Sequence, residues 1–211
     1  MMGEQYHMTL ENSTDQPWHF GVYQKHPSSP GLTSVAWQVR GIPPQAGSVP
    51  SSAQVTWTLD YGLCIANFDK DGRKYTGKQF APAYLGNVYK VASIDGIPSI
   101  DTKPIATGSS DQIVLKNNTG PYAEALTMGF TVSNNIIAVE DNVGGEQETM
   151  YRVHPTYYVA CYRNIVLGQL VDEGVVIGPV EVKYEGGVKS MKVAATKDAG
   201  GNYRLHVESM Q

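Results

Sequence analysis

The residue types most often used in metal binding and proton transfer are scattered along this 211-residue chain. No two of the five histidines, at positions 7, 19, 26, 154 and 206, stand at the spacing of a metal-binding pair on a helix. The sequence also lacks a G-x-S-x-G elbow, a glycine-rich phosphate loop and an H-E-x-x-H motif. These observations favour a protein that is not an enzyme and has no metal or cofactor. A hydrolase whose triad is assembled from distant Ser, His and Asp residues is a further hypothesis.

One acidic stretch resembles part of a calcium-binding loop. In "NFDKDG", Asn67, Asp69 and Asp71 stand at positions 1, 3 and 5 of such a loop, and Gly72 stands at the position of its sharp turn. The closing position is occupied by Lys78 in place of a bidentate Glu, and no flanking helical pattern is visible. The stretch is therefore a weak metal candidate, and we predict a hairpin turn without useful calcium affinity.

Tyrosine is the second source of candidate binding residues, since the chain has thirteen Tyr and three Trp against four Phe. Tyr and Trp stack on sugars and anchor protein interfaces while offering a hydrogen bond. In "HPTYYVACY", Tyr157 and Tyr158 are expected to project to opposite faces of a strand. The interface candidates are Tyr157, Tyr158, Tyr162 and His154. The alternative interpretation is a central strand that is buried on both faces.

The elements that must position these residues are strands, because apolar residues alternate with polar ones in most of the chain. The runs cover residues 6–10, 18–22, 35–39, 55–61, 113–115, 157–161, 180–184, 191–195 and 203–207. They predict an all-β protein, an antiparallel β-sandwich of about ten strands that forms a single domain over residues 1–211. Trp37 and Trp57, which are in register with apolar neighbours, are predicted to lie in its core.

Two features of the connections bear on the architecture. Residues 95–111 are rich in Pro, Gly and Ser and are interpreted as a long crossover loop or, alternatively, an interdomain linker. The stretches "LENSTDQPWHF" and "LKNNTGPYAEAL" have nearly the same order of residue types and begin 105 residues apart. Their Asn and Thr side chains are predicted to bond the turning backbone after a strand. Whether they also record a duplicated half-sandwich is left open by the sequence.

Charge and hydropathy limit the partners. The formal charge is −4 and Lys and Arg are not clustered, which argues against nucleic acid. No run approaches the roughly 20 apolar residues of a membrane helix, and the first residues do not follow the usual signal-peptide pattern. We expect a cytoplasmic protein, or one exported without a classical signal peptide. Cys64 and Cys161 lie in apolar alternating runs and are predicted to be buried free thiols.

Several stretches together resemble a known family. They are "LENST…WHFGVYQKHP", "VAWQV", "VTWTLDYGL", "LTMGFTV" and "HPTYYVACYRNIVLGQLVD", which occur in order along nearly the whole chain. They are similar to the RhiA-like family, named for a rhizosphere-expressed bacterial protein and found also in fungi. The resemblance implies a small all-β protein without an assigned catalytic residue, cofactor or substrate.

Three functional hypotheses follow from these patterns. The first is a non-catalytic interaction protein that forms a homo-oligomer or binds a protein partner through an aromatic-rich sheet surface. The alternative is a lectin-like module that binds a glycan, and the third hypothesis is the hydrolase. A glycan site should show an aromatic platform in a depression, whereas an assembly surface should be flatter and larger.

Overall fold

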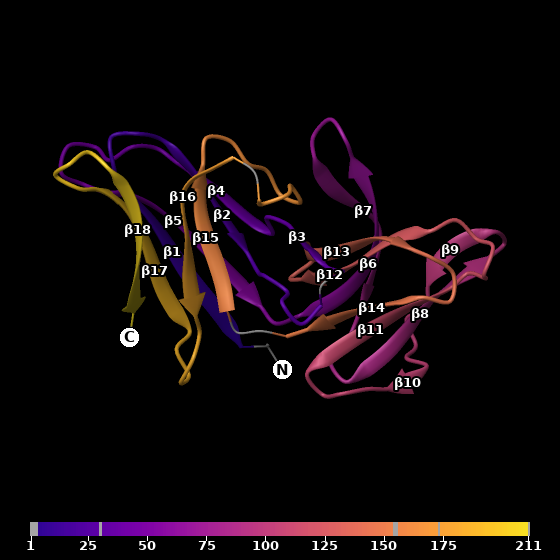
Figure 1. Ribbon diagram of the computed structural model, residues 1–211. Helices are drawn as coiled ribbons and strands as arrows, with labels where there is room; N and C mark the ends of the chain where they lie inside the picture. Colours follow the sequence, from indigo (N-terminus) through magenta and orange to yellow (C-terminus); the bar gives the residue numbers. More distant parts are fainter. Residues whose placement is uncertain (1–3, 30, 154–155, 173, 211) are drawn as a thin grey trace. The chain divides into compact units, whose positions relative to one another are not determined.

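The computed structural model describes residues 4–29, 31–153, 156–172 and 174–210. These residues form eighteen strands and no helix (Figure 1), so the prediction of an all-β fold is confirmed. The strands are more numerous than the ten or so expected, because alternation detects strands that bury one face. Strand β13 (Asn135–Val143), by contrast, buries four consecutive residues. Within the described residues, no helix has the length and hydropathy needed to cross a membrane.

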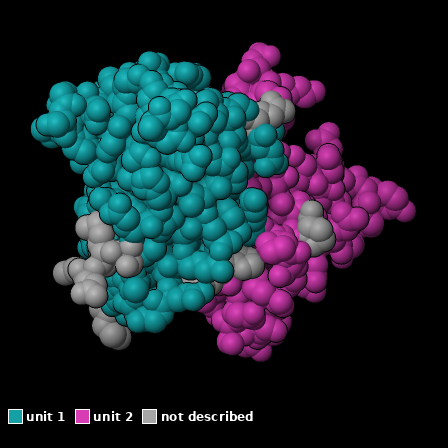
Figure 2. Space-filling model, turned by 60° about the vertical axis from the view of Figure 1, so that its left-hand side comes forward, with its two compact units in different colours: residues 1–25, 36–58, 154–211 teal, residues 26–35, 59–153 magenta. Residues whose placement is uncertain are grey.

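The strands are divided between two compact units, which Figure 2 shows in different colours. Unit 1 comprises residues 1–25, 36–58 and 154–211, and unit 2 comprises residues 26–35 and 59–153. The chain thus passes into unit 2 twice, over residues 26–35 and 59–153, and returns to unit 1 after each passage. The assignment of residues 1–211 to a single domain stays a prediction.

Unit 1 is built from two four-stranded sheets, with the orders β18-β17-β1-β5 and β16-β15-β2-β4. Neighbouring strands are antiparallel except β1 and β17, which pair in parallel. The bounds are β1 (Gln5–Ser13), β2 (Trp18–Tyr23), β4 (Gln38–Ile42), β5 (Ser51–Thr58), β15 (Thr156–Tyr162), β16 (Val175–Lys183), β17 (Ser190–Lys197) and β18 (Tyr203–Met210).

Aromatic side chains fill the core of unit 1. The ring centroids of Trp57 on β5 and Tyr157 on β15 are 5.1 Å apart, so this contact joins the two sheets. Trp37 and Tyr184 meet Trp57 edge-on at 5.5 and 5.4 Å. Trp37 is fully buried and Trp57 is 2% exposed. The prediction that both tryptophans belong to the core is therefore confirmed.

Unit 2 contains two five-stranded sheets, one with the order β3-β13-β12-β6-β7 and one with the order β10-β8-β11-β14, in which β9 also pairs with β8. The bounds are β3 (Thr33–Ser34), β6 (Tyr61–Asp69), β7 (Lys74–Pro82), β8 (Asn87–Ile94), β9 (Ile97–Ile100), β10 (Ala106–Thr107), β11 (Gln112–Asn118), β12 (Leu126–Val132) and β14 (Glu148–Arg152). Strands β8 and β11 are parallel neighbours, and residues 95–111 connect them within unit 2. That connection carries β9 and β10.

The two units share one strand plan. In unit 1, β1 lies between β17 and β5, and β2 lies between β15 and β4; in unit 2, β11 lies between β8 and β14, and β12 lies between β6 and β13. Each matching pair has the same parallel or antiparallel sense. The hairpins β15–β16 and β17–β18 correspond to β6–β7 and β8–β9. The first half of the chain (β1, β2 and β4–β9) and the second half (β11–β18) therefore contain the same series of eight strands, as a duplicated half-sandwich predicts. Each unit takes four strands from each half. The two-residue strands β3 and β10 fall outside this plan.

The two similar stretches stand at the ends of the equivalent strands β1 and β11. Asn12 and Asn117 are both fully buried. The Asn12 Oδ1 atom accepts hydrogen bonds from the backbone nitrogen and hydroxyl of Thr14, at 3.0 and 2.8 Å. Asn117 Oδ1 accepts the same pair of bonds from Thr119, at 3.2 and 2.7 Å. The prediction that these side chains bond the turning backbone is confirmed.

The predicted strand over residues 55–61 is wrong. Strand β5 ends at Thr58 and β6 begins at Tyr61, and the two strands belong to different units. Leu59, which was expected on the buried face, lies in the connection and is exposed. The alternation continued across this connection because Leu59 happens to fall at the spacing of the preceding apolar residues.

Candidate binding sites

Two of the predicted interface tyrosines lie in the core of unit 1. Strand β15 pairs with β16 on one side and β2 on the other, so its backbone offers no free edge. Tyr157 is 4% exposed, and its hydroxyl accepts a hydrogen bond from Nε1 of Trp57 at 3.2 Å. The hydroxyl of Tyr162 donates to the carbonyl of Val171 at 2.9 Å. Burial raises the pKa of Tyr162, so this hydroxyl keeps its proton as a donor.

Tyr158 is the predicted residue of β15 that reaches the surface, but its ring is already engaged. The ring stacks on Tyr23 at 5.7 Å between centroids, and Nζ of Lys25 lies 4.6 Å from its centroid. Its hydroxyl donates to Glu181 Oε2 at 2.9 Å. Burial, followed by this hydrogen bond, raises the pKa of Tyr158. His154, the fourth candidate, lies outside the described residues.

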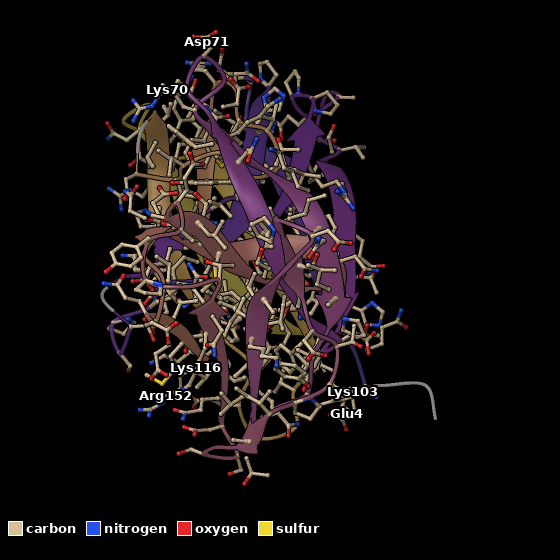
Figure 3. All side chains as sticks on the ribbon, turned by 90° about the vertical axis from the view of Figure 1, so that its right-hand side faces the viewer. Glu4, Lys70, Asp71, Lys103, Lys116 and Arg152 are labelled. Carbon is tan, nitrogen blue, oxygen red and sulfur yellow. The ribbon has the colours of Figure 1, made fainter. Side chains whose placement is uncertain are left out.

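The weak metal candidate forms the turn of the β6–β7 hairpin. Asp69 Oδ1 accepts hydrogen bonds from the backbone nitrogens of Asp71 and Gly72, at 3.1 and 3.2 Å. Figure 3 shows Lys70 and Asp71 at the tip of this hairpin, directed away from the sheets. Asp69 is thus used by the turn itself, as in many Asx turns. In the part of the chain that the structure describes, no three His, Cys, Asp or Glu residues are grouped as metal ligands. The weak calcium affinity of the loop stays a prediction.

The two cysteines are buried free thiols, as predicted. Burial raises the pKa of Cys64 to about 12 and also raises the pKa of Cys161. Both thiols are therefore protonated at neutral pH, and a protonated thiol is a poor nucleophile.

Unit 2 carries surface features that the sequence did not indicate. The large aromatic side chains exposed among the described residues, Phe68, Phe80, Tyr84 and Tyr122, all belong to this unit. Two depressions of about 340 and 290 Å³ share Asp60, Tyr61 and Pro82, near the start of β6 and the end of β7. Exposed aromatic rings beside concave surface are a common setting for recognition.

A larger cavity of about 570 Å³ lies between the end of β6, β7, β9 and the start of β12. Its walls are both apolar and polar, and they include Ile65, Asn67, Phe68, Pro98, Leu126 and Thr127. One side is held in place by Gln79, whose Oε1 accepts from the Ile100 nitrogen at 2.7 Å and whose Nε2 donates to the Pro98 carbonyl at 3.3 Å.

A hydrogen-bonded group supports the β12 side of this cavity. Thr127 donates to Asp141 Oδ1 at 2.7 Å, and the hydroxyl of Tyr75 donates to Asp141 Oδ2. Burial, followed by the bond to Asp141, raises the pKa of Tyr75. Tyr75 in turn contacts the ring of Phe68, with centroids 4.8 Å apart. These contacts hold Thr127 and Phe68, two residues of the cavity wall, in place.

Sequence reasoning missed this cavity because its walls come from four segments that share no motif. Asn67, one of the weak metal candidates, lies in one of these segments. The other local signal is an aromatic residue at a position expected to face solvent. Phe68 and Phe80 stand beside polar or charged neighbours such as Asp69 and Gln79, and both are exposed.

Comparison with known proteins places this molecule in a family. A family model described as RhiA matches residues 3–206. Protein RhiA of Rhizobium leguminosarum bv. viciae is 23% identical over 193 residues, which cover 88% of this chain and 80% of the relative. No solved structure matches the chain.

Proposed function

This chain belongs to the RhiA family, and we propose that it is a non-catalytic interaction protein that associates with a second copy of itself through the edge strand β7. The observation that carries the proposal is the state of this edge. Strand β7 is nine residues long and, among the described strands, pairs with β6 alone. A long edge strand presents unpaired backbone groups that another strand can bind.

The other sheet edges in the described part of the chain are shorter, except β16, which also has nine residues but contains Pro179, a residue without a backbone N–H to donate. Strands β3 and β10 have two residues each. Strand β14 has five residues, and its Glu148 and Arg152 pair with Lys116 and Asp111 at 3.1 and 3.2 Å. Charged side chains and short length are the usual means of preventing edge pairing. Strand β7 is not protected by short length, and its charged residues are Lys74 and Lys78.

The side chains of β7 also favour a contact. Phe80 is 53% exposed, and its ring lies beside Gly77 on the same strand. Aromatic residues are enriched at interfaces because they supply a large contact area. Identical chains most often pair about a two-fold axis, so two copies of β7 would meet antiparallel. The lectin-like alternative loses Tyr158 as a platform, because its ring is engaged by Tyr23 and Lys25. It keeps the exposed ring of Tyr84 beside Asp60 in the depression of about 340 Å³.

Light scattering over a series of protein concentrations tests the proposal. The wild-type mass should rise from monomer to dimer as the concentration increases. Phe80→Glu should remain a folded monomer throughout, because it places a charge in the centre of the contact. Val176→Glu is the matched control, since Val176 is also exposed on an edge strand, β16, and its replacement should leave the mass unchanged. A wild-type monomer at every concentration would refute self-association, and dissociation by Val176→Glu alone would refute the role of β7.

A further inference from the structure

Trp18 and Leu126 occupy equivalent positions in the two units. Trp18 is the first residue of β2 and lies opposite Ile42 in β4; Leu126 is the first residue of β12 and lies opposite Val143 in β13. On their other sides, β2 pairs with β15 and β12 pairs with β6, the strands that correspond in the shared plan. The start of β2 in unit 1 can therefore be compared directly with the start of β12 in unit 2.

In unit 1 this position is filled by an indole ring. Trp18 is fully buried, and its Nε1 donates to Thr14 Oγ1 at 2.9 Å. The ring of Tyr203 meets it edge-on at 5.2 Å, and the guanidinium of Arg163 lies over its face at 4.4 Å. The residues around Trp18 thus form a site that holds an aromatic ring, and in unit 1 this ring is the chain's own indole.

In unit 2 the corresponding surroundings form the wall of the 570 Å³ cavity. By strand register, Arg163 after β15 corresponds to Asn67 at the end of β6. Tyr203 on β18 corresponds in the same way to Pro98 on β9. Asn67, Pro98 and Leu126 all line the cavity. The cavity therefore lies where unit 1 holds its indole.

The difference arises in the preceding turn. Trp18 follows Asn12 by six residues, whereas Leu126 follows Asn117 by nine. The aromatic residue of the longer turn, Tyr122, is fully exposed instead of returning to the sheet. A leucine in place of a tryptophan leaves apolar surface without a packing partner.

We propose that this cavity of unit 2 binds a planar aromatic ring of about the size of indole, supplied by a small molecule. Its volume lies in the range of small-ligand pockets. Ile65, Phe68 and Leu126 offer apolar contact, and the polar part of the lining includes Asn67 and Thr127 and the charged residues Lys78 and Glu124. The site goes beyond self-association and does not depend on it.

Titration of the full chain with indole, followed by amide NMR spectra, tests the proposal. Indole should shift the amides at the end of β6, in β9 and at the start of β12, with a dissociation constant on the order of 0.1–1 mM, as expected for so few atoms. The saturated hydrocarbon hydrindane, an uncharged control of similar size, should bind at least about tenfold more weakly, because it offers no planar face to the ring of Phe68. Shifts that occur elsewhere, or equal binding of the two compounds, would overturn the proposal.

Two variants exchange the residues that distinguish the units. Leu126→Trp should fill the cavity, abolish the indole shifts and raise the unfolding midpoint, whereas retained binding contradicts the assignment. Trp18→Leu should open the equivalent place in unit 1, so that the variant binds two equivalents of indole. Its unfolding midpoint, lowered by the substitution, should rise again when indole is added. A folded Trp18→Leu protein that binds one equivalent would refute the equivalence. If that variant does not fold, Leu126→Trp decides alone, and self-association is read separately by light scattering.

Discussion

All three tryptophans of the chain are buried in unit 1, whereas unit 2, of similar length, contains none. Four aromatic residues that unit 2 does have, Phe68, Phe80, Tyr84 and Tyr122, are exposed, and three cavities lie in its surface. The same arrangement of strands thus encloses a tryptophan-rich core in unit 1 and a core without tryptophan in unit 2. Because large aromatic side chains bury the most area, the tryptophan-rich copy should be the more stable one. The other copy retains surface that can be used for binding.

The core of unit 1 is also more connected. Trp57 contacts the rings of Tyr6, Trp37, Tyr157 and Tyr184, with centroids between 5.1 and 6.0 Å apart. Such pairs contribute about 0.5–1.5 kcal/mol each beyond the buried area. In unit 2 the corresponding role falls to Tyr151, whose ring meets those of His26, Tyr61 and Phe130, with centroids between 5.4 and 6.2 Å apart. The comparison predicts that the largest mutational effects lie in unit 1.

Replacement of Trp57 should cause the largest loss. Trp57→Ala removes a side chain that is 2% exposed and leaves the hydroxyl of Tyr157 without its donor. We expect the free energy of unfolding to fall by about 3–5 kcal/mol. Tyr122→Ala is the matched change in unit 2 and should cost less than about 0.5 kcal/mol, because Tyr122 is fully exposed. Denaturant unfolding measures both, and a cooperative Trp57→Ala protein with an unchanged midpoint would contradict the comparison.

The paired asparagines should give a smaller and graded effect. The Asn12 amide nitrogen lies within hydrogen-bond distance of the carbonyls of Gln16 and Pro43, both at 2.8 Å, whereas the Asn117 amide bonds the carbonyl of Val143 at 2.8 Å. Asn12→Ala is therefore expected to destabilise by about 3 kcal/mol and Asn117→Ala by about 2 kcal/mol, from the polar groups left unpaired. Amide exchange, resolved by residue, would show whether each loss is confined to its own unit. Equal losses in both units would mean that they do not unfold separately.

The sequence predicted the two units unequally well. Each of the eight strands of unit 1 overlaps or adjoins a predicted run, but in unit 2 only β11 was predicted as a strand of its own. Strands of unit 1 such as β1 alternate between buried and half-buried residues along most of their length, which is the pattern that alternation detects. Burial of consecutive residues weakens the period-two signal of β6, β12 and β13, but it does not explain the difference alone, since β2 and β15 of unit 1 also bury four consecutive residues and were predicted.

The binding site could not be predicted for a related reason. Composition and propensity favour Tyr157 and Tyr162 equally as core or as surface, and only their packing in the structure, such as the contact of Tyr157 with Trp57 of the other sheet, shows that they are buried. The cavity depends on what is missing, namely an aromatic side chain at Leu126. A local alignment of the two similar stretches places Tyr122 beside Trp18, and only strand register reveals that Leu126 is the true counterpart.

The smallest expected effect concerns acid. Asp15, in the turn that leads to Trp18, pairs with Lys197 Nζ at 2.7 Å and accepts a hydrogen bond from the Tyr203 hydroxyl at 2.8 Å. The bonds from Lys197 and Tyr203 lower the pKa of Asp15 below its ordinary value of 3.8. A lowered pKa in the folded state means that the stabilisation is complete above pH 3.8 and is lost as the pH falls through the folded value.

Asp15→Asn should therefore lower the unfolding midpoint slightly near neutral pH, and the difference from wild type should disappear in acid. The effect is small because the carboxylate is exposed to solvent. Asp71→Asn, at the tip of the β6–β7 hairpin of unit 2, is the control and should leave the midpoint unchanged at every pH. Midpoints measured by thermal unfolding at a series of pH values check this. A constant difference between Asp15→Asn and wild type down to low pH would show that the turn before Trp18 depends on the shape of the side chain and not on its charge.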